Sequence, residues 1–348
     1  MTGRKEIASL ATRLPLVAIG RGLLGLLAAG LVAAPWLLGP ADLQVITELL
    51  CLLVLAVMWN LLAGYADIIT IGQHGFVGIG CYAFYAFAVY TNLDPYLAIP
   101  LAGVVTLAFA VPSMVIIFRL RAAYLAVGTW VLAEVMMLGA GKIKAFGAGL
   151  GISLPISVVR TFGGSIVERF TTIYWLSLVL AFVAMGATWL LMRSRTGIGL
   201  TAMRDDEEAA GTIGVNLFRA RVICFLWAAP FLGLAGALIT LQKLRIAPAA
   251  SFSIIDWTVY IIFIVVIGGV GSFEGPIIGT VVFFLIREYL QSWGVWHFIV
   301  LGVVSIGMVM IEPRGIWGLL RRVVPGDLIP VSHTPPRGEG AGEREGAA

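Results

Sequence analysis

Runs of about 20 apolar residues recur along this chain, and they constrain its fold more than any other feature. A helix needs about 20 residues to cross ~30 Å of hydrocarbon, because it rises about 1.5 Å per residue. Only 12% of the 348 residues are charged, whereas roughly 25% are charged in a typical soluble domain. Lipid is therefore the main solvent. Since an open sheet cannot satisfy its backbone hydrogen bonds in lipid, each run is expected to be a helix.

The apolar runs predict an all-α bundle of about ten membrane-spanning helices. Their ranges are residues 14–38, 45–63, 75–90, 96–118, 122–140, 171–192, 222–241, 257–267, 276–290 and 295–311. The first run is longer than the core of a signal peptide, which favours a retained helix over a cleaved one. We expect a cytoplasmic tail at residues 1–13, a membrane domain at residues 14–320, and a disordered cytoplasmic tail at residues 321–348, where Gly, Pro and charge dominate.

The positions of Lys and Arg predict that both chain ends are cytoplasmic. With the N-terminus inside, the cation-bearing connections at residues 119–121, 193–221 and 314–322 all fall on the cytoplasmic side. The connection at residues 141–170 disagrees, because this count places it outside. Its cations are Lys142, Lys144, Arg160 and Arg169. Either this connection folds against the membrane on the outside, or the helix count is off by one nearby.

Two polar, glycine-rich breaks interrupt the apolar pattern near opposite ends of the chain. The first break is residues 64–80 (GYADIITIGQHGFVGIG) and the second is residues 268–279 (GGVGSFEGPIIG). Polar backbone at membrane depth is tolerated only where protein or a water-filled cavity covers it. These segments either border a translocation pathway or are tight cytoplasmic turns. The candidate pathway residues within them are Asp67, Thr70, Gln73, His74 and Glu274.

Two carboxylates lie inside the apolar runs, and either would be costly if it faced lipid. Glu48 and Glu134 should therefore each face a partner or a cavity. Glu134 is a further candidate pathway residue, although a structural hydrogen bond is the alternative. Small residues four apart also predict close helix packing. They are Gly275 with Gly279, and Ala229 with Gly233 and Ala237.

The connection at residues 193–221 is the most charged part of the membrane domain. It holds nine of the 42 charged residues in 29 positions and includes RDDEEAAGTIGVN at residues 204–216. Asp205 can cap a short helix, and Gly214 can end it. Negative charge in the first turn meets the positive end of the helix dipole. The acids of that turn are Asp206, Glu207 and Glu208.

This short helix would carry a small apolar stripe. The spacing of Ala209, Ala210 and Ile213 places them on one face of about two turns. Such a helix is unstable alone and needs a partner surface, although a solvated loop is the alternative. The pattern EAAxxxG, formed by Glu208, Ala209, Ala210 and Gly214, is typical of the coupling loop in permeases of ATP-binding-cassette importers. The residues assigned to coupling are Arg204, Asp205, Asp206, Glu207, Glu208, Ala209, Ala210 and Gly214.

From about residue 43 to residue 320, the chain resembles LivM-type permeases, the inner-membrane subunits of branched-chain amino acid importers. Both breaks and the stretch at residues 193–216 carry this resemblance. Further matching stretches are RLRAAYLAVGTWVLAEV at Arg119, GAGLGISLP at Gly147, FLGLAGAL at Phe231 and EPRGIWG at Glu312. Asp67 and Thr70 depart from the family, which commonly has glycine and serine there. Urea, short amides, other amino acids and aromatic acids are therefore alternative cargoes.

The resemblance implies a complex in the bacterial inner membrane. Its other members would be a second, LivH-like permease, two cytoplasmic ATPases that bind residues 193–216, and a periplasmic solute-binding protein. It implies no cofactor and no metal. The chain has no GxxxxGK[ST] phosphate loop, so the energy must come from a partner. Its scattered cations do not favour nucleic acid as a partner.

Two other classes of protein fit the composition less well. An ion-coupled transporter could use Glu48, Asp67 or Glu134, but it would not explain the EAAxxxG loop. An intramembrane enzyme would need a nucleophile or a metal. The chain has three histidines, no HExxH spacing, and no Ser or Cys with a nearby His and an orienting acid.

Overall fold

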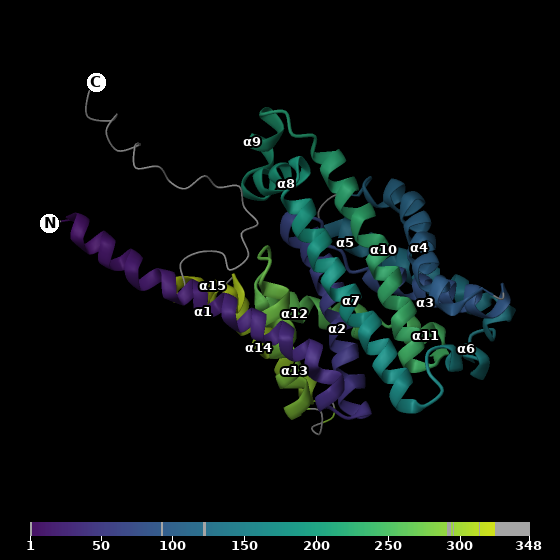
Figure 1. Ribbon diagram of the computed structural model, residues 1–348. Helices are drawn as coiled ribbons and strands as arrows, with labels where there is room; N and C mark the ends of the chain where they lie inside the picture. The colour runs from purple at the N-terminus through teal and green to yellow at the C-terminus, as the bar shows by residue number, and fades with distance from the viewer. Residues whose placement is uncertain are drawn as a thin grey trace.

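Helices make up almost all of the computed structural model of the chain, as the sequence predicts (Figure 1). The model describes residues 2–91, 93–120, 123–290, 294, 296–312 and 314–323, and the side chains of these residues except 2–17, Asp205, His297 and Val323. Each of the ten apolar runs coincides with a helix. These helices are α1 (Thr2–Leu37), α2 (Pro40–Asn60), α3 (Gln73–Tyr90), α4 (Pro95–Ile117), α5 (Ala123–Lys142), α7 (Ile166–Met192), α10 (Leu217–Lys243), α12 (Tyr260–Gly268), α13 (Gly275–Leu290) and α14 (Trp296–Ile311).

Shorter elements lie between and after these helices. Two π-helical turns, η1 (Leu61–Tyr65) and η3 (Ile255–Val259), extend α2 and precede α12. Strands β1 (Ile152–Ser153) and β2 (Arg245–Ile246) pair antiparallel. The remaining elements are η2 (Lys144–Phe146), α6 (Ile156–Thr161), α8 (Arg195–Asp205), α9 (Glu207–Thr212), α11 (Pro248–Ser251) and α15 (Gly315–Val323).

By the criteria of length and hydropathy, fewer helices qualify as membrane spans than the ten predicted. Within the described residues, seven helices are long and apolar enough to cross a membrane, or eight if the bent pair Phe298–Ile311 and Gly315–Arg322 counts as one span. Helices α3 and α13 are two further predicted spans that do not meet this criterion. The bundle is therefore confirmed as polytopic and all-α, while the count of ten stays a prediction.

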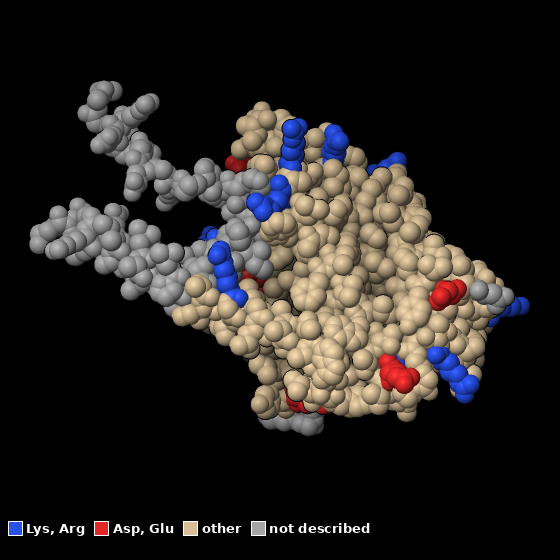
Figure 2. Space-filling view, viewed as in Figure 1, with Lys and Arg blue, Asp and Glu red and all other residues tan. Residues whose placement is uncertain are grey.

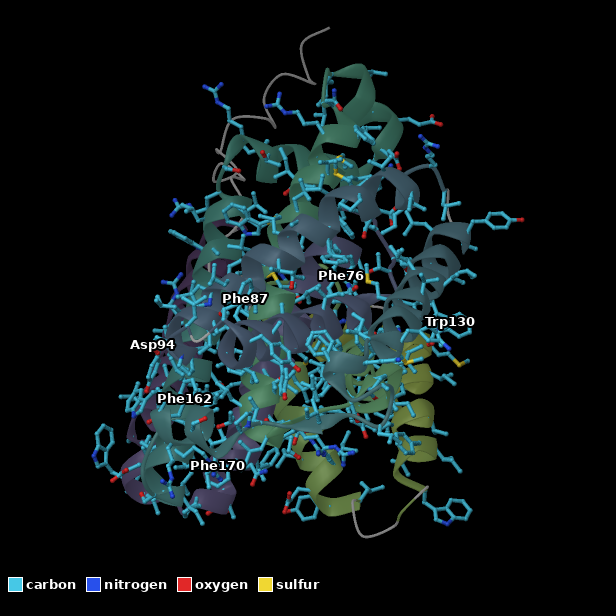
Figure 3. All side chains as sticks on the ribbon, turned by 90° about the vertical axis from the view of Figure 1, so that its right-hand side faces the viewer. Phe76, Phe87, Asp94, Trp130, Phe162 and Phe170 are labelled. Atoms are coloured by element: carbon cyan, nitrogen blue, oxygen red, sulfur yellow. The ribbon has the colours of Figure 1, made fainter. Side chains whose placement is uncertain are left out.

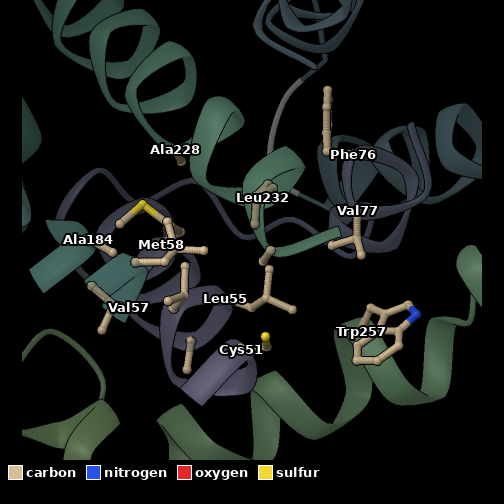
Figure 4. Packing of buried hydrophobic residues seen from close by; sticks show 14 of the residues in the cluster. Cys51, Leu55, Val57, Met58, Phe76, Val77, Ala184, Ala228, Leu232 and Trp257 are labelled. Carbon is tan, nitrogen blue, oxygen red and sulfur yellow. The ribbon is translucent and has the colours of Figure 1, made fainter. Parts of the chain in front are cut away.

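Helix α2 lies at the centre of the bundle. Buried residues make up 83% of its membrane-length window, compared with 6% for α1. This follows from a sequence that is apolar on every face, since such a helix needs neighbours all around it. Helices α7, α10 and α12 pack against it. Figure 4 shows Cys51, Leu55, Val57 and Met58 of α2 among Ala184, Ala228, Leu232 and Trp257.

The predicted stripes of small residues are confirmed as close helix contacts. A Cβ added at Gly233 of α10 would overlap the side chain of Thr106 in α4. A Cβ added at Gly279 of α13 would overlap the carbonyl oxygen of Ile264 in α12. Ala229 and Ala237 are both buried. These small side chains let the helix backbones approach one another.

The two ends of the bundle differ. Helices α8 and α9 form one end, while α6 and α11 lie at the other, which we call the distal end (Figure 1). The connection at residues 143–165 lies at the distal end, because β1 pairs with β2 at the end of α10. The connection therefore lies opposite α8 and α9, where the predicted alternation places it, while the helix count stays a prediction. In Figure 2 a broad band without charged side chains separates the two ends. The orientation across the membrane stays a prediction.

The chain ends add one detail to the predicted domain limits. Helix α1 begins at Thr2, so the backbone shows no boundary between the predicted tail at residues 1–13 and the first membrane helix. Helix α15 continues to Val323, three residues into the predicted C-terminal tail. The rest of that tail lies outside the described residues.

Candidate functional site

The acidic stretch folds as a short helix, as predicted, but its cap is Asp206 and not Asp205. The carboxylate of Asp206 accepts a hydrogen bond from the backbone N–H of Ala209 at 3.0 Å. The prediction is wrong by one residue because α8 continues through Asp205, and the chain turns only at Asp206. Glu207 and Glu208 occupy the first turn. At six residues, α9 is about two turns long at 3.6 residues per turn, as predicted.

Gly214 ends the helix in the way the sequence predicts. Its φ of 91° lies in the left-handed region that favours glycine. Its N–H donates to Gly211 O at 3.2 Å, and the N–H of Val215 donates to Ala210 O at 3.1 Å. These two bonds form a Schellman motif, which satisfies carbonyls that the helix end leaves free. The path of the chain from α9 into α10 is therefore fixed.

The apolar stripe on α9 is divided between two surfaces. Ala210 is buried against the rest of the chain, whereas Ala209 is exposed and Ile213 is 76% exposed. Ile213 and Ile198 of α8 line a hollow of about 580 Å³ that Arg195 borders. Exposed apolar side chains with a polar rim mark interaction surfaces. This end of the protein therefore offers a partner an apolar contact.

Arg204 joins the end of α8 to both breaks. Its Nη1 donates to the carbonyl oxygen of Gly271 at 3.1 Å, and its guanidinium lies 5.8 Å from the ring centre of Tyr65. Asn60, at the end of α2 and shortly before the first break, is bonded to the second break. Its Nδ2 donates to Ser272 O at 2.8 Å, and its Oδ1 accepts from the N–H of Gly271 at 2.8 Å. Segments more than 200 residues apart in sequence thus form one assembly.

Glycines make this close approach possible. A Cβ at Gly64 would lie 2.5 Å from the backbone nitrogen of Gly271. Gly271 itself has a φ of 72°, and Gly315 at the start of α15 has a φ of 65°. A Cβ at Gly315 would lie 2.6 Å from the nitrogen of Gly269, so the C-terminal EPRGIWG stretch also packs on the second break. Side chains at these positions would push the backbones apart.

Arg221 provides a second link between α9 and the first break. Its Nη2 forms a 2.9 Å ion pair with Glu207 Oε2, and its Nε donates to Ala66 O at 3.4 Å. The next residue, Asp67, is exposed and has a φ of 53°, which is uncommon for a residue other than glycine. Asp67, Glu207 and Arg221 line a hollow of about 900 Å³. Helix α9 and the first break therefore share one charged surface.

The other candidate pathway residues of the breaks are buried, each with no more than 3% of its surface exposed. These residues are Thr70, Gln73, His74 and Glu274. Gln73 Nε2 donates to Thr70 Oγ1 at 2.7 Å, and His74 Nδ1 lies 3.1 Å from Thr258 Oγ1. Hydrogen bonds inside the bundle account for Thr70 and Gln73, whereas Nε2 of His74 is buried and has no hydrogen-bond partner among the described residues. Their place on a pathway stays a prediction.

The two carboxylates within the apolar runs have different surroundings. Glu48 forms an ion pair with Arg287 of α13, with Oε1 and Nη1 3.3 Å apart. It thus has the partner that the sequence demands. Glu134 on α5 is half-buried, and its Oε1 accepts a 3.3 Å hydrogen bond from Trp130 one turn away. A pathway role for Glu134 also stays a prediction.

Three residues of this assembly escape the sequence analysis. Asn60, Arg221 and Thr258 each join elements that are distant in sequence. Asn60 carries a usable signal, since it is a lone amide in an apolar run, and the rule applied to Glu48 would have selected it. Arg221 and Thr258 resemble many other polar residues at helix ends, so the sequence alone does not indicate their partners.

Comparisons with known proteins identify the family and several relatives of the chain. Residues 43–311 match the family described as the permease component of branched-chain amino acid transport systems. The LivM permease of the high-affinity branched-chain amino acid transport system of Salmonella typhimurium is 26% identical over 83% of this chain and 73% of its own length. The LivM protein of Escherichia coli is 25% identical over the same shares. A probable LivM of Methanocaldococcus jannaschii is 25% identical over 57% of this chain and 55% of its own. No solved structure matches the chain.

Proposed function

The chain belongs to the family of branched-chain amino acid transport permeases, and from this membership we propose that it is the membrane-spanning subunit of an ATP-binding-cassette importer. Its cargo would be a branched-chain amino acid, as the names of its relatives state for those proteins. A related small polar solute is the alternative, since Asp67 and Thr70 depart from the family pattern. The complex would work in a bacterial inner membrane.

The observation that carries this proposal is the pair of links from the α8–α9 region to the breaks. Arg204 reaches Gly271 in the second break, and Arg221 joins Glu207 to Ala66 in the first. A displacement of α9 would therefore pull on backbone at both breaks. Closely packed helices transmit such a displacement, because a well-packed interior deforms little. This supports a coupling role for α9.

We infer the partners from the family membership, and the exposed face of α9 supports one of them. Two cytoplasmic ATPases would bind α9 and the exposed Ile213 beside it, where an apolar contact is available. A second, LivH-like permease would complete the membrane part, and a periplasmic binding protein would deliver the solute. Because the binding protein selects the solute, the cargo is best tested with the whole complex.

Uptake by the reconstituted complex tests this function. We expect liposomes that hold the permease pair and the ATPases to accumulate radiolabelled leucine or valine only with internal ATP and external binding protein. Competition with urea, short amides and aromatic acids then ranks the alternative cargoes. Uphill uptake by the permease alone, driven by an ion gradient, would instead identify an ion-coupled transporter.

Glu208→Lys should lower the uptake per ATP hydrolysed at least about fivefold while the protein still inserts. Glu208 is exposed in the first turn of α9, so the change reverses charge on the face offered to the ATPase. Charge at a helix end contributes only about 0.3–1 kcal/mol to stability, so folding should survive. The readouts are membrane insertion, ATPase rate and uptake, all in the same liposomes.

Glu288→Lys is the matched control, because Glu288 is also exposed but lies near the distal end of α13. The control should transport normally. Equal uptake by the Glu208→Lys and Glu288→Lys variants would argue against a coupling role for α9.

A further inference from the structure

The hollow beside the first break has walls of two kinds. Its volume of about 900 Å³ lies within the ~300–1,000 Å³ typical of small-molecule sites. Asp67, Glu207 and Arg221 form a charged side, and apolar side chains from the break, α4, α5 and α10 form the rest. Figure 3 shows Phe162 and Phe170 at the opposite, distal end of the bundle. The hollow therefore lies at the predicted cytoplasmic end.

The apolar side of this hollow is exposed yet held in place. We call Ile69, Phe118 and Phe218 the apolar wall. Ile69 is 57% exposed and Phe218 is 62% exposed. Phe118, at the end of α4, packs edge-on against Phe218 and Phe225 of α10, with ring centres 5.9 and 5.7 Å apart. Such a wall is suited to cover an apolar side chain of a ligand, because contact removes apolar surface from water.

Asp67 places a carboxylate in the hollow on backbone that favours glycine. Its φ of 53° lies in the left-handed region, where glycine is unstrained. Asp67 makes no hydrogen bond or ion pair within the described part of the chain. Strained backbone that persists in a fold is often found at functional sites. The carboxylate is therefore available to a cationic group of a ligand.

Arg221 provides the opposite charge in the same hollow. Its Nη2 pairs with Glu207 Oε2, and its Nε donates to the carbonyl oxygen of Ala66, the residue before Asp67. Its Nη1 has no partner among the residues that the structure describes. An arginine fork binds a carboxylate through two N–H groups. A cation, an anion and an apolar wall together match a free amino acid, which has a carboxylate, an ammonium group and a side chain.

Other ligands would leave part of this hollow unpaired. An anionic lipid headgroup would bring its negative charge close to Asp67 and Glu207. A simple amine or a metal cation would gain nothing from Arg221. An apolar side chain of a partner protein would cover Asp67 without pairing it, and burying an unpaired charge is costly.

We propose that this hollow binds a free α-amino acid with an apolar side chain, with the carboxylate on Arg221, the ammonium group on Asp67 and the side chain against the apolar wall. The source of the ligand rests on the importer function proposed above, because imported cargo accumulates at this end. A carboxylate on Arg221 competes with Glu207, and the Glu207–Arg221 pair links α9 to the first break. Accumulated cargo therefore weakens this link and slows its own import.

The binding test compares leucine with two analogues that each lack one charged group. Isocaproate lacks the ammonium group, and isoamylamine lacks the carboxylate. Equilibrium binding is measured on the whole complex in an uncharged detergent, without binding protein or ATP. We expect each analogue to bind at least about tenfold more weakly than leucine, because one charge-assisted contact is lost.

Asp67→Asn should lower the affinity for leucine at least about tenfold, while isocaproate binds at least as tightly as before. Asparagine adopts left-handed backbone readily, so the fold is kept. Asp42→Asn is the matched control, because Asp42 is an exposed aspartate in the first turn of α2, at the distal end. This control should bind leucine like the unchanged complex.

Three results would overturn the site. The first is equal leucine affinity of the Asp67→Asn and Asp42→Asn variants. The second is isocaproate binding as tightly as leucine to the unchanged complex. The third is displacement of leucine by phosphatidylethanolamine, whose headgroup also carries both charges, since that result would assign the hollow to lipid.

Liposomes loaded with unlabelled leucine test the effect on import. Internal leucine should slow ATP-driven uptake of radiolabelled valine at least about threefold in the unchanged complex. The slowing should be smaller in Asp67→Asn, each complex being compared with its own rate without internal leucine. Uptake that internal leucine does not slow would overturn the feedback role. If the unchanged complex takes up no solute, the importer function fails, while the binding data still decide whether the hollow holds an amino acid.

Discussion

Arg204→Ala should uncouple ATP hydrolysis from uptake and leave the protein folded in the membrane. The variant loses the donor to Gly271 O and the cation over the ring of Tyr65, so α8 no longer holds the two breaks. A hydrogen bond from a charged donor contributes about 1.5–3 kcal/mol, and each 1.4 kcal/mol is about tenfold in an equilibrium. We expect uptake per ATP hydrolysed to fall at least about tenfold.

Arg193→Ala is the matched control for this experiment. Arg193 is an exposed arginine of the same connection, and its guanidinium also lies over an aromatic ring, that of Trp189 at 4.6 Å. That contact stays within one turn of α7 and reaches neither break. The measurement is the ratio of solute accumulated to phosphate released, in liposomes with equal amounts of inserted protein. If both variants keep the same ratio, Arg204 does not transmit motion.

The sequence predicts local features of this site well. The acidic first turn of α9 and the left-handed Gly214 follow from preferences that act within a few residues. The cap was misplaced from Asp206 to Asp205 because two neighbouring aspartates are equally good caps. Only the point at which α8 ends decides between them, and α8 continues through Asp205. Helix boundaries of this kind are not encoded by composition alone.

The contacts that define the assembly could not be predicted in the same way. Arg204 and Gly271 are 67 residues apart, and Asn60 and Gly271 are 211 apart. No periodic pattern connects such positions, because they meet only after the helices between them have packed. The outward direction of Ile213 is a similar case. Its spacing with Ala210 suggested one common face, whereas the structure buries only Ala210.

The structure bears on one of the two sequence interpretations of the breaks, the turn, while the translocation pathway stays a prediction. In the second break Gly269 and Gly271 have φ of 131° and 72°, as turn glycines can, whereas none of the glycines at residues 64–80, all of them described, has a positive φ. The second break is also bonded to Asn60 at the end of α2 and to Arg204 of α8. A turn with such partners is a place where displacement of a neighbouring helix can alter the positions of α3 and α13. Turn and coupling roles are thus compatible in one segment.

Gly275→Leu should prevent stable folding of the second break, and Gly139→Leu should not. A Cβ at Gly275 would overlap the carbonyl oxygen of Gly269, and a Cβ at Gly268 would overlap that of Gly275. Backbone atoms cannot move aside as the end of a flexible side chain can. We therefore expect Gly275→Leu to lower the free energy of unfolding by more than the ~1–3 kcal/mol typical of overpacked cores. A Cβ at Gly139 meets nothing within 4 Å.

Thermal unfolding in detergent, together with size-exclusion profiles, measures this difference. Gly139→Leu should unfold at or above the temperature of the unchanged protein, because leucine favours helix more than glycine does. Gly275→Leu should unfold at a lower temperature or aggregate, and it should not assemble with its partners. A Gly275→Leu protein that is as stable and active as the control would mean that α12 and α13 can separate without loss. In that case the second break would be only a turn, and the route from Arg204 through Gly271 into α13 could not carry the motion proposed for α9.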